Sequence, residues 1–162
     1  MGIWTTTPKD WANGVVVTDT DFDTHLRDFA NAFGAKTSYT PTLAGFTIGN
    51  GTITGSYTQI QKTVWFEAVL TFGTTTAAAS AVPTCTLPVT AASSAVNASL
   101  VRAQFIDNGT AAYLAAGRLL TTTTCAAYII GASGILTTPS TTTPHTWANA
   151  DSIYWSGVYE AA

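Results

Sequence analysis

Charged residues are scarce in this chain. Asp, Glu, Lys and Arg make up 9% of its 162 residues, whereas about 25% is usual for a soluble domain. The six basic residues are dispersed and never adjacent, so the chain lacks the positive patch that binds nucleic acids or anionic membrane surfaces. We therefore expect neither a nucleic acid nor a membrane as its partner.

Long apolar runs are also missing. No fully apolar stretch approaches the roughly 20 residues that a membrane-spanning helix needs. The first residues, MGIWTTTPKDWANG, show no basic segment followed by an apolar one, which is the pattern of a signal peptide. We expect a chain that is synthesised in the cytoplasm without a signal peptide.

Cysteine is limited to Cys85 and Cys125, and the two do not form a Cys-x-x-Cys pair. Each lies in a Thr- and Ala-rich stretch of strand-like sequence. A disulfide is uncommon in a protein made in the cytoplasm, and neither of the two histidines, His25 and His145, has a catalytic signature around it. We predict two reduced, buried thiols rather than a disulfide or a catalytic nucleophile.

Clusters of metal ligands are missing as well. Asp19, Asp21 and Asp23 alternate like the start of a calcium loop, but Thr24 and Ala30 stand where the glycine and the distal glutamate would be. Acidic residues at the start of a helix, where they favour the helix dipole, account for this pattern better. We expect no metal, no cofactor and no enzymatic activity, so the chain is interpreted as not an enzyme.

The charges that do occur are crowded at one end. Eight of the fifteen lie between Met1 and Thr37, and the other seven are spread over the rest of the chain. This division predicts two parts. Residues 1–37 form an arm and an amphipathic helix for attachment or oligomerisation, and residues 38–162 form a β-rich body.

The predicted helix covers residues 18–34, with Thr18 as N-cap and Gly34 as its stop. Its large apolar residues are spaced by 4, 3 and 4 positions and share one stripe. The stripe must be buried against the β-body, against sister chains or against a partner particle. Trp residues in the preceding arm either fold back on their own domain or dock on another chain, and we favour docking. The predicted interface consists of Trp4, Trp11, Phe22, Leu26, Phe29 and Phe33.

Short alternating stretches dominate the body. Residues 64–72 and 152–160 alternate apolar and polar positions, and Asn-Gly pairs mark tight turns, as at Asp107-Asn108-Gly109. Residues 52–54 and 57–60 are expected to be separate strands, and 77–82 a loop. About seven to nine such strands predict a mainly β fold, an antiparallel β-sandwich or jelly-roll-like body with a short N-terminal α-helix.

Glu67 can be interpreted in two ways, as part of a binding site or as an ordinary surface residue. It shares a strand face with Trp65, and the pair would suit a sugar-binding groove. A lone acid without a partner is more often an exposed, solvated strand residue. Glycoside hydrolysis needs a second carboxylate in the same groove, which makes a hydrolase the weakest of the functions considered.

Two stretches of the chain resemble a family of small tailed-phage virion proteins. They are WTTTPKDWANGVVVTDTDFDTHLRDFANAF (4–33) and YTPTLAGFTIGNGTITGSYTQIQKTVWF (39–66), which together cover about a third of the chain. The family's helix carries a Leu-Arg-Asp core, here Leu26-Arg27-Asp28. Asp23 and Phe29 stand where the family usually has Asn. The resemblance does not distinguish capsid decoration proteins, head fibres and minor tail proteins.

The resemblance implies a non-enzymatic virion structural protein on the particle surface, made in the host cytoplasm and attached to capsid or tail proteins through its N-terminal segment. The alternative is a receptor- or glycan-binding module of a tail tip or fibre, with a host surface glycan as partner. The heptad-like stripe and the low-charge surface further predict a homotrimer.

Overall fold

The computed structural model describes residues 16, 18–22, 36–78, 81–131 and 133–162. The chain divides into two compact units, Met1–Thr37 and Ser38–Ala162. In the first unit the described residues contain one helical turn, α1 (Asp19–Phe22). Residues 23–35 lie outside the described part of the chain, so a longer N-terminal helix is not shown and the helix at 18–34 stays a prediction.

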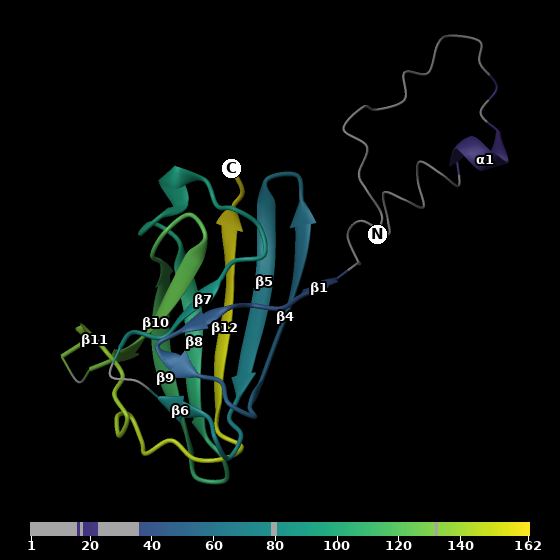
Figure 1. Cartoon of the computed structure of the whole chain (residues 1–162). Helices are drawn as coiled ribbons and strands as arrows, with labels where there is room; N and C mark the ends of the chain where they lie inside the picture. Colours follow the sequence, from purple (N-terminus) through teal and green to yellow (C-terminus); the bar gives the residue numbers. More distant parts are fainter. Residues whose placement is uncertain (1–15, 17, 23–35, 79–80, 132) are drawn as a thin grey trace. The chain divides into compact units, whose positions relative to one another are not determined.

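The second unit is an antiparallel β-body (Figure 1). Its strands are β1 (Thr37–Tyr39), β2 (Leu43–Ala44), β3 (Phe46–Thr47), β4 (Thr52–Ile60), β5 (Thr63–Thr71), β6 (Ala77–Ala78), β7 (Thr84–Thr86), β8 (Leu100–Asp107), β9 (Ala111–Leu119), β10 (Thr124–Ile130), β11 (Leu136–Thr137) and β12 (Ser152–Glu160). Ten of them form one sheet in the order β1-β4-β5-β12-β8-β9-β10-β7-β2, with β11 on β10, while β3 and β6 pair separately. The prediction of a mainly β, sandwich-like body is confirmed.

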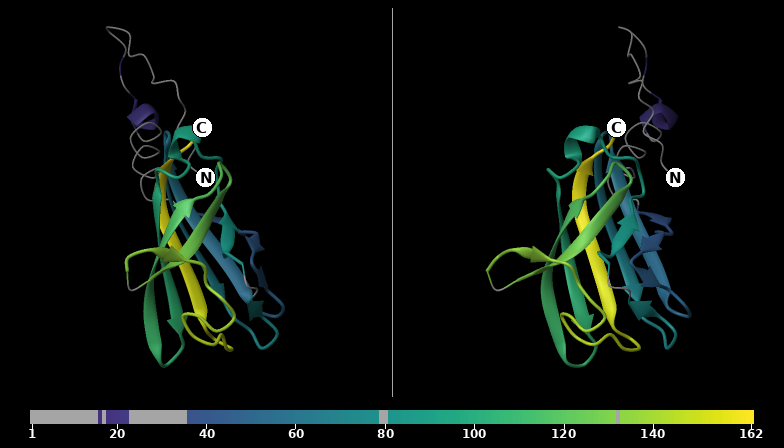
Figure 2. Two further views of the ribbon diagram at one scale, coloured as in Figure 1. Left: turned by 90° about the vertical axis from the view of Figure 1, so that its left-hand side faces the viewer. Right: turned by 60° about the vertical axis from the view of Figure 1, so that its left-hand side comes forward.

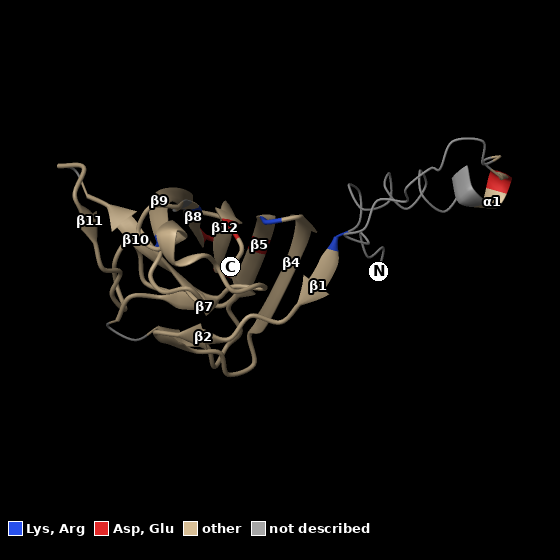
Figure 3. Ribbon diagram, turned by 90° about the horizontal axis from the view of Figure 1, so that it is seen from above, with Lys and Arg blue, Asp and Glu red and all other residues tan. Residues whose placement is uncertain are grey.

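The large sheet curls into a half-barrel because of how its two ends are connected. β1 and β2 stand at opposite ends of the strand order, yet Thr40, Pro41 and Thr42 alone separate them in the chain. The Thr86 amide donates to the Thr42 carbonyl oxygen at 3.0 Å and so fixes the second end of this crossing. Proline suits such a position because it has no amide proton to give to a strand ladder. The curl of the long strands can be followed in Figure 2, and the short strands β2 and β7 lie opposite β5, β12 and β8 in the view from above (Figure 3).

The core is built from the alternating faces of the long strands. Val64, Phe66, Ala68 and Leu70 of β5 are all buried, as their alternation predicts. Their neighbour β12 buries its own alternate residues Ile153, Trp155 and Tyr159. The apolar side chains that interdigitate inside the curl make a single core, and every one of the described core residues lies between Leu43 and Ala161.

Two predictions about the strands are wrong. Residues 52–60 form one strand, β4, rather than two. Gly55 lets the strand continue, because a Cβ there would collide with the ring of Tyr39, which lies against it. Ala77–Ala78 is not in a loop but forms β6, since its backbone pairs with Phe46 and Thr47 of β3.

Candidate binding groove on the outer face of the sheet

The predicted attachment residues are not placed by the structure. Trp4, Trp11, Leu26, Phe29 and Phe33 lie outside the described residues. Phe22 is the last residue of α1, and its side chain is not described. Their role at an interface stays a prediction, and the candidate site must be sought in the β-body.

A hollow of about 350 Å³ lies on the face of the sheet that points away from the core. Three neighbouring strands, β5, β12 and β8, form its floor. We call it the outer-face groove, and its lining residues are Glu67, Val69, Arg102, Ala103, Gln104, Tyr154, Trp155 and Ser156. Ala103 and Trp155 belong to the buried core, so the other six supply the chemistry of the groove.

Strand register explains why the sheet is hollowed here. Ser156 of β12 stands directly opposite Glu67 of β5 and Arg102 of β8. Beyond these two, the same row continues with Ser56 on β4 and Ala116 on β9. Directly opposed residues of an antiparallel sheet share a face. The long side chains of Glu67 and Arg102 therefore stand on either side of the small side chain of Ser156, which leaves a hollow between them. Since strands are about 4.8 Å apart, Glu67 and Arg102 flank Ser156 with their backbones roughly 10 Å apart.

A second row adds an aromatic wall to the groove. Tyr154 of β12 is opposite Val69 of β5 and Gln104 of β8. Its side chain is 44% exposed, although it stands on a strand in the middle of the sheet. Trp65 is equally exposed, at 44%, but it is not among the residues that line the groove. The sequence interpretation of a groove with Glu67 therefore finds an aromatic partner in Tyr154 rather than in Trp65.

The two charged residues of the groove differ in how they are held. Glu67 Oε1 accepts a hydrogen bond of 2.7 Å from Ser56 Oγ, which orients the carboxylate. Arg102 is exposed, and no hydrogen bond or ion pair is seen between its guanidinium and the described residues. The rest of the body carries little charge (Figure 3). The groove thus combines a carboxylate that Ser56 orients with a guanidinium that makes no hydrogen bond to the described residues.

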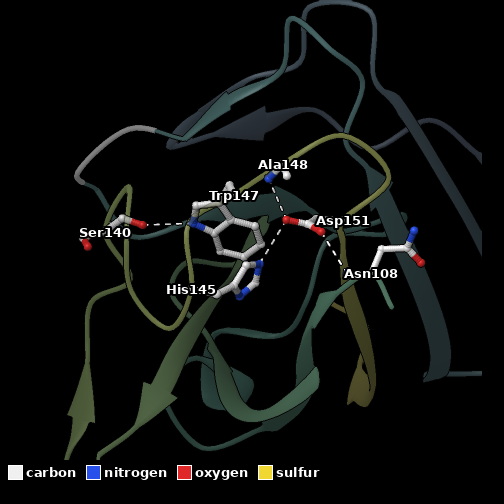
Figure 4. A network of polar contacts seen from close by, with 6 residues as sticks. All are labelled: Asn108, Ser140, His145, Trp147, Ala148 and Asp151. Atoms are coloured by element: carbon white, nitrogen blue, oxygen red, sulfur yellow. Dashed lines mark hydrogen bonds and ion pairs between the residues drawn. The ribbon is translucent and has the colours of Figure 1, made fainter. Parts of the chain in front are cut away.

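A second cluster of polar residues is buried at one end of the body (Figure 4). Asp151 is 1% exposed. Its carboxylate accepts hydrogen bonds from the backbone amides of Asn108, at 2.9 Å, and Ala148, at 2.7 Å. It also contacts His145 Nε2 at 3.2 Å. The His145 ring stacks on Tyr113 and tilts against Trp147. This cluster ties the loop before β12 to the turn between β8 and β9.

The His145 and Asp151 pair has the composition of a catalytic dyad but not its surroundings. Both side chains are buried, and three donors already occupy the carboxylate. His145 Nδ1 is buried without a hydrogen-bond partner among the described residues. Within the described part of the chain, no group of three or more His, Cys, Asp or Glu side chains is placed to hold a metal ion. We interpret the pair as an anchor for the loop.

The cysteines are buried free thiols, as predicted. Cys85 of β7 is directly opposite Cys125 of β10, both are fully buried, and their Sγ atoms are 3.2 Å apart. The contact with Cys125, together with burial, raises the pKa of the Cys85 thiol. A thiol held protonated is a poor nucleophile, so this pair contributes packing rather than chemistry.

Comparisons with known proteins add no information about the function of the groove. No protein-family model, no curated protein and no solved structure matches the chain. The described residues include no helix that is both long enough and apolar enough to cross a membrane.

Sequence reasoning found one of the five polar or aromatic residues outside the core that line the groove. Glu67 was a candidate because it alternates with apolar residues on β5. Arg102, Gln104 and Tyr154 carry no local signal that separates them from other outward-facing strand residues. Their meeting depends on β12, the last strand of the chain, lying between β5 and β8.

Proposed function

We propose that this chain is a non-enzymatic structural protein displayed on the surface of a phage virion, as a capsid decoration protein, head fibre or minor tail protein. Residues 1–37 attach it to capsid or tail proteins and to sister chains in a homotrimer. Residues 38–162 project from the particle. The chain is made in the host cytoplasm and reaches the virion by assembly.

The observation that carries this proposal is the independence of the β-body. The chain divides after Thr37, and the described core draws only on residues 43–161. The second unit therefore holds the described core within itself. We assign attachment to the large apolar residues of the first segment, because residues 4–33 resemble virion proteins.

A second candidate function is receptor or glycan binding by the body. The outer-face groove favours it, because an exposed aromatic ring and four hydrogen-bonding side chains line it together. Among its lining residues the groove holds a single carboxylate, Glu67. Glycoside hydrolysis uses a pair of them, so the groove is better suited to binding than to cleavage. A displayed virion protein and a receptor-binding one are compatible roles.

Incorporation into particles tests the first proposal. A phage strain in which this chain is deleted is complemented with tagged wild type, with residues 38–162 alone, or with the Phe22→Ala, Phe29→Ala double variant. Purified particles are then stained with an antibody to the tag. We expect labelled particles with wild type and a loss of at least tenfold with the other two. A Trp65→Ala variant, altered on the exposed face of β5, is the matched control and should label normally.

Two outcomes count against the proposal. Particles that carry no wild-type protein would exclude a virion role. If the 38–162 chain and the double variant are incorporated at wild-type occupancy, the N-terminal segment is not the attachment device. Light scattering of the purified full chain at micromolar concentration tests the trimer, and a monomer alone would contradict it.

A further inference from the structure

We propose that the outer-face groove binds an anionic saccharide, with Tyr154 as the stacking surface, Arg102 as the ligand of its carboxylate or phosphate, and Glu67 and Gln104 as partners of its hydroxyl groups. This inference rests on the proposed glycan-binding role of the body. It adds to that role a chemical class of ligand and an orientation for it.

The ring of Tyr154 supplies a surface on which a sugar can stack, which is the first requirement of a saccharide site. A sugar ring has an apolar C–H face, and an aromatic side chain offers a large apolar surface with a polar end. Tyr154 is 44% exposed although its strand has neighbours on both sides. The hollow of about 350 Å³ is at the small end of the range of ligand sites, about 300–1,000 Å³. It suits a small ligand.

Arg102 supplies the second requirement, an oxyanion site. It is the one basic residue among the groove's lining residues. A guanidinium presents a planar fork of donors that matches a carboxylate or a phosphate oxygen pair. In contrast, the Arg118 guanidinium lies over the ring of Tyr128 at 5.6 Å, and its Nε is buried. Arg102 is thus the guanidinium that a ligand in the groove can reach.

Glu67 makes the groove polar from one side to the other. It stands across Ser156 from Arg102, and its carboxylate is oriented by Ser56. A carboxylate accepts hydrogen bonds from hydroxyl groups and repels an anion. The acidic group of the ligand is therefore directed to the β8 side, and neutral hydroxyls to the β5 side. Gln104, which offers both donors and an acceptor, lies two residues from Arg102 on the same face.

Two other ligand classes fit the groove less well. An extended peptide adds to a free strand edge, but β5, β12 and β8 are each paired on both sides. A nucleic acid needs several cations along its backbone, and the groove has Arg102 alone among its lining residues. A small polyhydroxylated anion uses Arg102, Glu67 and Gln104 together.

A glycan array probed with the labelled full-length chain tests the inference. The array carries neutral oligosaccharides, their uronate- or sialate-containing counterparts and their phosphorylated counterparts. We expect binding to acidic members only, at least tenfold weaker for Arg102→Ala and for Tyr154→Ala, and partly retained by Arg102→Lys. The carboxylate and phosphate arms show which oxyanion is preferred.

Matched controls separate the groove from the rest of the surface. Lys62→Ala removes an exposed cation at the turn between β4 and β5, and Trp65→Ala removes an equally exposed ring outside the groove. Both should bind like wild type, and thermal unfolding should show all variants folded.

The outcomes distinguish the inference from the role on which it rests. Equal binding to neutral and acidic members, unchanged by Arg102→Ala, would overturn the anionic preference and leave glycan binding intact. Binding that Tyr154→Ala does not weaken would move the site elsewhere. No binding to any member would overturn glycan binding by the body, and with it this inference, whereas the virion role is decided by particle labelling.

Discussion

Replacing Asp151 with alanine should weaken the β-body more than any change on its surface. The carboxylate accepts from two backbone amides, of Asn108 and Ala148, and contacts the His145 ring. Asp151→Ala leaves all three groups without their partner. A buried donor left unpaired costs about 1–3 kcal/mol; the contact with His145 is buried, and the two amide bonds are partly buried. Part of the summed loss is offset because the variant no longer desolvates a carboxylate, so we expect a net loss of about 3–5 kcal/mol.

Urea unfolding followed by tryptophan fluorescence measures this loss. With a slope of about 1–3 kcal/mol per molar urea for a domain of this size, the midpoint should fall by roughly 2 M. Trp147 stacks on the Phe72 ring and lies tilted against the His145 ring, so its emission should also respond to loosening of the loop before β12.

Asn108→Ala is the matched control for Asp151→Ala. The bond from Asn108 to Asp151 uses the backbone amide, which the substitution keeps, so the free energy of unfolding should change by less than about 1 kcal/mol. An Asp151→Ala variant within 1 kcal/mol of wild type would refute the anchor interpretation. So would an equal loss in both variants.

Three further predictions concern the core. The Tyr159 hydroxyl donates to the Val89 carbonyl oxygen at 2.7 Å and accepts from the Val89 amide at 3.2 Å, so Tyr159→Phe should cost about 1–2 kcal/mol of unfolding free energy at neutral pH. Burial raises the pKa of Tyr159 from 10.0 to about 12; the unfolded chain therefore loses this proton first, and wild-type stability should fall between about pH 10 and 12. The stability of the Phe variant should fall less over that interval in urea titrations, and parallel curves would contradict the assignment. Cys85 and Cys125, both fully buried, should react with a thiol reagent only as fast as the protein opens, and complete labelling within seconds under native conditions would show that they are accessible. Gly117→Ala should cost about 1–3 kcal/mol by overpacking, because a Cβ there collides with a backbone carbonyl of β10; a thermal midpoint equal to that of wild type would show that the strands can separate at no cost.

The strands and several of the turns could be predicted from the sequence because their signals are local. Alternation with a period of two follows from strand geometry itself, and it identified the buried face of β5 correctly, whereas for residues 152–160 it did not show which face is buried. Asn108-Gly109 marked the β8–β9 turn, where Gly109 has a positive φ of 79°. Burial of the two thiols followed from their Thr- and Ala-rich, strand-like surroundings.

Strand order, and with it the groove, was decided by the tertiary structure. Glu67, Arg102 and Tyr154 meet because the last strand of the chain inserts between β5 and β8, and no local pattern encodes which strands become neighbours. The same holds for Asp151, a lone acid in a loop, whose burial depends on the distant turn at Asn108. Backbone periodicity is a property of a few consecutive residues, whereas these sites require surfaces far apart in the chain to pack together, which the curled sheet alone brings about.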